Sequence, residues 1–131
     1  MSDNIDIVRG GYNDFLAGNV PGVLERFADD FTFSVPGAPD VPYAGTFHNR
    51  AELGRFFQEM GEEITMSLFE PREYFASGDR VVVLGHYEGK VNRTGAPYAS
   101  DWAMAWTFKD GKVVAMQELS DPAQLRKGFA G

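Results

Sequence analysis

The sequence feature that most constrains the fold is a hairpin signal near the C-terminal end. Lys-Asp-Gly at 109–111 separates two runs rich in strand-forming residues, at 98–108 and 112–121. An Asp-Gly pair between alternating apolar residues is a strong local signal for a β-hairpin. We therefore expect the last third of the chain to contain paired antiparallel strands.

Two turn lengths fit this sequence, and they decide which side chains share a face. A two-residue turn at Asp110-Gly111 pairs Lys109 with Lys112, whereas a three-residue turn pairs Phe108 with Lys112 and leaves Gly111 left-handed in a bulge. The three-residue turn is predicted because it separates bulky from small side chains. One face then carries Trp102, Met104, Trp106, Phe108, Val114, Met116 and Glu118, with Glu118 opposite Trp102, and the other carries Asp101, Ala103, Ala105, Thr107, Val113, Ala115, Gln117 and Leu119.

These two faces predict different surroundings. The bulky face holds one carboxylate and requires a helical layer or a ligand to cover it. The other face is small and mostly apolar, and helices can cover only one side of the sheet. An exposed patch of this kind is typical of an interface, so we expect a homodimer that pairs through the outer sheet face.

Length and composition limit the class of protein. The 131 residues are a normal size for one domain, predicted to span 1–131. The net charge of −7 makes nucleic acid and anionic membranes poor partners, and the absence of cysteine excludes disulfides and thiolate metal sites. No apolar run is long enough to span a membrane, and the N-terminal residues do not resemble a signal peptide, so a cytoplasmic protein is expected.

The first half of the chain shows helical periodicity, interrupted by one short strand. Apolar residues at helical spacing predict a helix over 3–17, and Asn19 is expected to cap a short second helix. Alternation over 31–35 predicts a strand that ends at Pro36, and the Pro- and Gly-containing segment 36–47 is expected to be a loop. Asn49 followed by Glu52 is a capping-box pattern, which predicts a helix over 50–61.

The second half shows strand patterns. Strands are predicted over 64–75, with an interruption or edge position near Pro71, and over 80–91, followed by the hairpin. A short helix is expected over 122–129. The order α-α-β-α-β-β-β-β predicts an α+β fold in which helices cover one face of a curved sheet.

These landmarks together resemble a known superfamily. They are Phe-Ala-Asp-Asp at 27–30, Val-Pro-Gly at 35–37, Tyr-Ala-Gly at 43–45, Gly-Asp-Arg-Val-Val-Val at 78–83, and the 102–106 strand with Asp-Gly-Lys at 110–112. In this order the chain resembles the SnoaL-like, ketosteroid-isomerase-related members of the nuclear transport factor 2-like superfamily, over almost its whole length. The resemblance implies a cone formed by a curved antiparallel or mixed sheet, with helices packed on its concave face.

The resemblance also implies where functional residues would fall. An acid used by limonene-epoxide-hydrolase-like and polyketide-cyclase-like members falls on Glu118. Other family positions hold different residue types here: the base aspartate of the steroid isomerases falls on Ser34 or Val35, and their oxyanion-binding acid near Met104. Their tyrosine falls near Gly11, one residue from Tyr12. The epoxide-hydrolase arginine and aspartate fall on Gly85 and Tyr87, and the cyclase histidine falls on Met104.

Glu118 is the first catalytic candidate. A carboxyl among aromatic side chains has its ionised form desolvated, so its pKa should rise and suit it to proton transfer near neutral pH. The structural alternative is a carboxylate at a strand end that reaches solvent or pairs with an arginine. Tyr87, on the face of its strand predicted to point toward the helices, is the second candidate. Its hydroxyl would serve a ligand or Glu118, or would bind a backbone carbonyl.

The remaining candidates line a predicted pocket. These ligand-binding residues are Tyr12, Phe33, Val35, Phe57, Trp102, Met104, Trp106 and Met116. His86 shares its face with Glu88 and Lys90 and is expected at a surface or interface, and His48 is expected in a solvated loop. No metal motif, phosphate loop or dinucleotide fingerprint is present, so no metal and no cofactor are expected.

Two functions are compatible with these residues. The first is a cofactor-independent acid–base enzyme of isomerase, cyclase or hydratase type that acts on a small hydrophobic molecule. In it Glu118 moves the proton, and Tyr87 or Tyr12 binds the developing oxyanion. The second is a non-catalytic module of the same fold that binds a small hydrophobic ligand or serves dimerisation.

Overall fold

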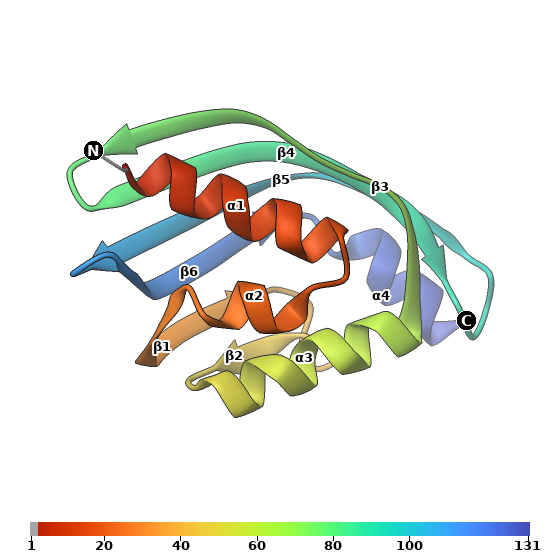
Figure 1. Cartoon of the computed structure of the whole chain (residues 1–131). Coiled ribbons are helices and arrows are strands. Elements are labelled where there is room, and N and C mark those ends of the chain that lie inside the picture. The colour runs from red at the N-terminus through yellow and green to blue at the C-terminus, as the bar shows by residue number, and fades with distance from the viewer. Residues whose placement is uncertain (1–2) are drawn as a thin grey trace.

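Helices and strands alternate along the chain in the predicted order, with one additional short strand. The structure is a computed structural model that describes residues 3–131 (Figure 1). Its helices are α1 Asn4–Leu16, α2 Val20–Leu24, α3 Arg50–Glu63 and α4 Ala123–Ala130. Its strands are β1 Phe27–Val35, β2 Gly45–Phe47, β3 Ile64–Ser77, β4 Arg80–Val91, β5 Pro97–Lys109 and β6 Lys112–Ser120. None of these helices is long and apolar enough to cross a membrane.

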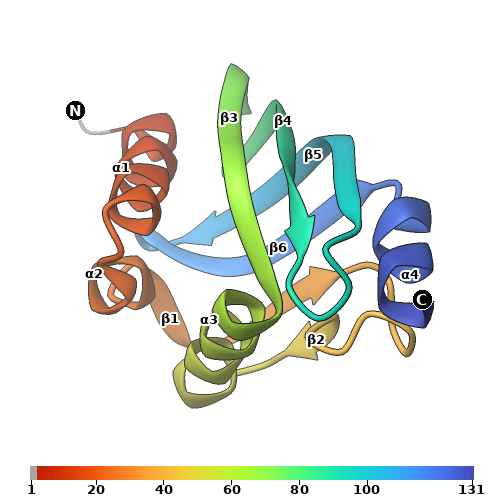
Figure 2. The ribbon, with the colours of Figure 1, turned by 90° about the vertical axis from the view of Figure 1, so that its right-hand side faces the viewer.

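A single curved sheet organises the fold. Its strand order is β2-β1-β6-β5-β4-β3, with β1 parallel to β6 and every other pair antiparallel. The long strands arch over α1, while α3 and α4 lie toward the other end of the sheet (Figures 1 and 2). This is the cone of the nuclear transport factor 2-like fold, and the α+β class with a mixed sheet is confirmed.

Side-chain caps explain where the helices begin. The side chains of Asp3 and Asn19 accept from the backbone N–H groups of Asp6 and Gly22, respectively. Asn49 accepts from the N–H of Glu52 at 2.9 Å, and the Glu52 carboxylate accepts from the N–H of His48 at 2.8 Å. The predicted cap by Asn49 is therefore present, but Glu52 accepts from the residue before the cap and not from Asn49, so only half of the predicted capping box forms.

The first two strands differ from their predicted bounds because partners distant in sequence determine them. β1 begins at Phe27, four residues earlier than predicted, where Phe27 pairs with Val113 of β6. Residues 45–47, expected to be loop, form β2 by pairing with the end of β1. A three-residue strand is too short to show a period of two, so its sequence carries no local signal.

The predicted three-residue turn is wrong. Lys109 pairs with Lys112, so the turn is the two-residue Asp110-Gly111, and both turn residues have positive φ. Such a turn matches the twist of the flanking strands. The extra residue lies further along, since Phe108 pairs with Val113 whereas Thr107 pairs with Ala115, and Val114 is bulged out.

The bulge corrects the predicted faces at two places. Val113 replaces Val114 on the bulky face and is 1% exposed. Glu118 lies opposite Met104, and Ser120, rather than Glu118, lies opposite Trp102. Beyond the bulge, Met116 and Glu118 lie on the concave face with Met104 and Trp106. The shorter turn alone would turn them to the convex face, and the one extra residue of the bulge turns them back.

Aromatic side chains fill the space between the sheet and the helices. Tyr12 of α1 packs against the rings of Phe69, Tyr74, Trp102 and Trp106, with centroids 5.7 to 6.3 Å apart. Trp102 stacks on Phe69 at 5.1 Å, so the indole lies flat along the inside of the sheet. Gly85 of β4 makes this possible, because a Cβ there would meet the indole at 2.3 Å and the carbonyl oxygen of Glu70 at 2.6 Å.

We predict that Gly85→Ala lowers the free energy of unfolding by about 2 kcal/mol, because the added methyl overpacks the layer against a rigid indole and backbone. Gly61→Ala is the matched control. Gly61 lies in α3 with nothing within 4 Å of the added Cβ, so this change should be neutral or stabilising. Urea unfolding of both variants measures the difference, and equal stabilities would contradict the packing argument.

Candidate active site

An apolar cavity lies between the helices and the concave face of the sheet. It has a volume of about 90 Å³ and is lined by residues from all four helices, from β1 and from the four later strands. Of the predicted ligand-binding residues, six line it: Tyr12, Phe33, Val35, Phe57, Met104 and Trp106. Trp102 and Met116 lie outside the lining, Trp102 stacked on Phe69 and Met116 packed in the core at 1% exposure.

Glu118 supplies the carboxyl of this cavity. It projects from β6, and its Oε2 accepts a hydrogen bond from the Ser120 hydroxyl at 2.8 Å. The Tyr87 hydroxyl, from β4, lies 3.2 Å from Ser120 Oγ and 3.4 Å from Glu118 Oε2, so its single proton can be donated to either oxygen. The three side chains form a short polar cluster in otherwise apolar surroundings.

Burial determines the charge behaviour of this cluster. Desolvation raises the pKa of Glu118, and the hydrogen bonds from Ser120 and Tyr87 oppose that rise only in part. Burial likewise raises the pKa of Tyr87, and the neighbouring Glu118 adds to the effect. Glu118 takes part in none of the ion pairs among residues 3–131, so no basic side chain there offsets its desolvation.

Tyr12 provides a second hydroxyl in the cavity. It accepts a hydrogen bond from the indole N–H of Trp106 at 3.1 Å and donates to the sulfur of Met104 at 3.3 Å. Burial raises its pKa, so the hydroxyl remains neutral. A thioether is a weak acceptor, and the Tyr12 proton is therefore free to turn toward a better acceptor on a ligand.

Comparison with known protein families identifies the family of this fold. The model of the SnoaL-like domain matches residues 8–116, which include most of α1, the strands β1 to β5 and the first part of β6, whereas Glu118 lies just beyond the matched residues. The chain belongs to the SnoaL-like domain family.

Solved structures and a curated relative extend the comparison. A nuclear transport factor 2-like protein from Burkholderia xenovorans LB400 is 32% identical, with a TM-score of 0.87, over 96% of this chain and 95% of that one. TerC, co-crystallised with polyporic acid, is 27% identical with a TM-score of 0.87, over 99% of this chain and 100% of that one. The uncharacterised protein YesE of Bacillus subtilis (strain 168) is 22% identical over 82% of this chain and 74% of its own length.

Several residues of the site in this SnoaL-like chain were missed in the sequence. Tyr98 lines the cavity, and Ser120 donates to Glu118 from outside the lining. Both share the face parity of Trp102 and Glu118, so strand alternation could have identified them. Tyr43 lies in the aperiodic segment before β2 and carries no such signal. Arg26 also lines the cavity, but its guanidinium pairs with Asp14 at 2.5 Å and donates to the carbonyl of Gly22, so it is not a free cation.

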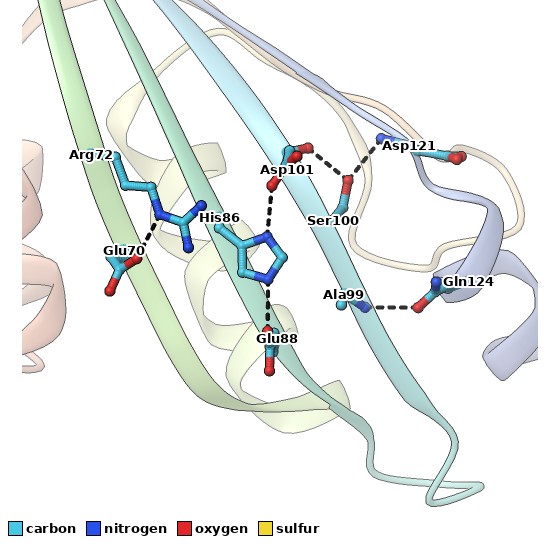
Figure 3. Close-up of polar contacts among 9 residues, drawn as sticks. All are labelled: Glu70, Arg72, His86, Glu88, Ala99, Ser100, Asp101, Asp121 and Gln124. Atoms are coloured by element: carbon cyan, nitrogen blue, oxygen red, sulfur yellow. Dashed lines mark hydrogen bonds and ion pairs between the residues drawn. The ribbon is translucent and has the colours of Figure 1, made fainter.

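His86 lies outside the cavity, on the convex face of the sheet (Figure 3). Its two ring nitrogens lie 2.8 Å from an Asp101 oxygen and 2.7 Å from a Glu88 oxygen. The hydrogen bond with Glu88, and then that with Asp101, raises the pKa of His86. His48 is exposed, and its backbone serves the α3 cap and β1. No group of three or more His, Cys, Asp or Glu side chains within residues 3–131 is placed to hold a metal ion.

We predict that Glu118→Gln is as stable as the wild type near pH 4 and equally or more stable at pH 7. A carboxyl whose pKa is raised by folding binds its proton more tightly in the folded state. The wild type therefore loses stability as pH rises from the ordinary pKa of 4.5 toward the folded value, and the uncharged variant does not. Thermal melts from pH 4 to pH 7 measure this. A variant that is less stable at pH 7 but equal at pH 4 would instead indicate that Glu118 is a structural ion-pair partner.

Proposed function

We propose that this SnoaL-like protein is a cofactor-independent acid–base enzyme, of isomerase, cyclase or hydratase type, that acts on a small hydrophobic molecule. The observation that carries the proposal is the Glu118 carboxyl, held by two hydroxyls in an aromatic cavity and without an ion-pair partner in the part of the chain that the structure describes. A carboxyl with a raised pKa is a better general base and acid near neutral pH than an exposed one.

In this proposal Glu118, when ionised, removes a proton from a carbon next to a carbonyl group. The electron pair of the broken C–H bond moves to the carbonyl oxygen, and Glu118 later returns the proton to the same or a conjugated carbon. Tyr12 is the better placed donor for the developing oxyanion, because its proton is held only by a thioether while the Trp106 N–H polarises its oxygen. The proton of Tyr87 is already engaged in the Glu118–Ser120 cluster.

The relatives and the cavity size support a ring-shaped ligand. TerC, which shares 27% identity, was co-crystallised with polyporic acid, which supports a small organic ligand for this chain as well. The cavity of about 90 Å³ is smaller than a cavity of about 150 Å³ that holds benzene, so it accepts at most a single-ring compound, and only when lining side chains move. Half-buried side chains such as Phe57 and the flexible Met60 are placed to make that movement.

We predict that a panel of single-ring enones, lactones and epoxides contains a compound that the wild type converts, or whose α-hydrogens it exchanges in D₂O. Glu118→Gln should lower that rate by about 10²-fold or more, because it removes the general base while keeping the shape of the side chain. Ligand affinity, measured separately, should change little. Binding without any difference in rate between the two proteins would favour a ligand-binding module over an enzyme.

We also propose that the protein forms a homodimer through the convex face of the sheet. The outward-facing row across β4, β5 and β6 contains Leu84, Ala103 and Leu119, of which Leu84 is 37% and Leu119 is 55% exposed. Phe75, in the adjacent row on β3, is 54% exposed. Large apolar side chains gathered on one face are typical of an interface, and a second copy offers a matching surface.

We predict that light scattering at micromolar concentration gives twice the mass of the chain, and that Leu84→Asp gives the monomer mass. A buried, unpaired carboxylate at the centre of the interface would prevent association. Leu16→Asp is the matched control, because Leu16 is 57% exposed on α1, away from the sheet face. A monomeric wild type would overturn the dimer proposal without affecting the catalytic one.

A further inference from the structure

The hydroxyl of Tyr98 is buried without a hydrogen-bond partner among residues 3–131. The residue is 3% exposed, so bulk water does not satisfy the group. A buried hydroxyl without a hydrogen bond lowers the stability of the fold. Phenylalanine would fill the same space without leaving a hydrogen-bond donor unpaired. The packing of the core therefore does not account for the Tyr98 oxygen.

The residue that carries this hydroxyl belongs to the cavity lining. Tyr98 lines the cavity, and its ring lies over the backbone of β4 at Gly89, where a Cβ would stand 2.6 Å from the Tyr98 oxygen. The other unpaired buried group, the indole N–H of Trp102, belongs to a side chain outside the cavity lining. Within residues 3–131, Tyr98 is thus the residue that combines an unpaired buried polar atom with a place in the cavity lining.

Tyr98 and Glu118 mark two separate polar points of the cavity. Tyr98 precedes Met104, the partner of Glu118, by six residues on β5, so the two residues lie at different points along the sheet. Tyr87 lies between them, since its ring packs against that of Tyr98 at 5.7 Å and its hydroxyl lies 3.4 Å from Glu118. Burial raises the pKa of Tyr98 to about 12, so its hydroxyl remains a neutral donor.

We propose that Tyr98 is a second ligand-anchoring residue, whose hydroxyl hydrogen-bonds an oxygen atom at the end of the substrate away from Glu118. The proposal rests on the proposed function, because it takes the same cavity as the substrate site. The substrate class is then an apolar ring compound with oxygen groups at both ends: a carbonyl whose α-carbon faces Glu118, and a hydroxyl or second carbonyl that reaches Tyr98. The aromatic lining between the two points packs against the ring, and the two polar contacts fix its direction.

A matched pair of single-ring probes tests this assignment. Acetophenone carries one oxygen, and 4-hydroxyacetophenone carries a second oxygen at the opposite end of the same ring. Quenching of tryptophan fluorescence reports binding, since Trp106 lines the cavity. We expect the wild type to bind 4-hydroxyacetophenone about tenfold more tightly than acetophenone, as one buried hydrogen bond implies. In Tyr98→Phe this preference should fall to nearly one, with acetophenone affinity unchanged.

The matched control is Tyr74→Phe, which removes the same oxygen from a tyrosine on the concave side but outside the cavity lining. It should keep the tenfold preference. The assignment is overturned by a wild type that shows no preference or no binding of 4-hydroxyacetophenone at millimolar concentration. It is also overturned by a Tyr98→Phe variant that keeps the preference, as when an ordered water satisfies the hydroxyl, or that weakens both probes equally, as a packing defect would.

A second readout separates this inference from the proposed function. Exchange of the acetophenone methyl hydrogens in D₂O, followed by mass spectrometry, reports proton transfer at Glu118. Glu118→Gln should lose the exchange and keep the preference for 4-hydroxyacetophenone. Equal exchange in the wild type and Glu118→Gln would overturn the catalytic role while leaving Tyr98 as an anchor. Exchange that depends on Glu118, together with no preference for 4-hydroxyacetophenone, would support the catalytic role of Glu118 and overturn the anchoring role of Tyr98.

Discussion

The bulge at Val114 determines which side chains of β6 face the cavity. Without this extra residue, the two-residue turn would place Ala115 and Gln117 opposite Trp106 and Met104. Glu118 would then point to the convex side, because a shift of one residue moves every side chain of a strand to the other face. Pairing with β1 accompanies the bulge, since Val113 donates to the carbonyl of Arg26 where the parallel pairing begins. The site therefore depends on backbone geometry at the far end of the strand that carries its carboxyl.

Two glycines on β4 allow the aromatic layer to lie close to the sheet. Gly85 accommodates the indole of Trp102, and Gly89 accommodates the ring of Tyr98, each at a distance that a Cβ would occupy. Both rings pack against the adjacent strand at these glycines, and of the two residues Tyr98 lines the cavity. The inward positions of β4 therefore alternate here between glycine and a large side chain, because Tyr87 lies between Gly85 and Gly89.

Local patterns in the sequence predicted most of the elements, because caps and periodicity act over a few residues. Asn49 and Glu52 located α3, and alternation located β4 and the concave face of β5. The patterns failed where distant pairing decides the outcome. β2 exists because its three residues meet the end of β1, and the bulge reflects how β6 fits between β1 and β5. Glu118 was found because the predicted and the observed register both place it on the concave face of the sheet. Tyr43 was missed because it lies in an irregular segment that only tertiary packing brings to the cavity.

Glu118 is the one carboxyl in the cavity lining among residues 3–131, and its side chain is half-buried. Arg26 reaches the lining but is held by Asp14, and the carboxylates around His86 lie on the convex face. A nearby free cation would hold Glu118 ionised and lower its pKa, which would weaken it as a base. Hydroxyl partners such as Ser120 and Tyr87 instead orient the carboxyl while adding no formal charge. Desolvation of a carboxyl without a basic partner lowers the stability of the fold at neutral pH. The same desolvation makes Glu118 suited to proton transfer.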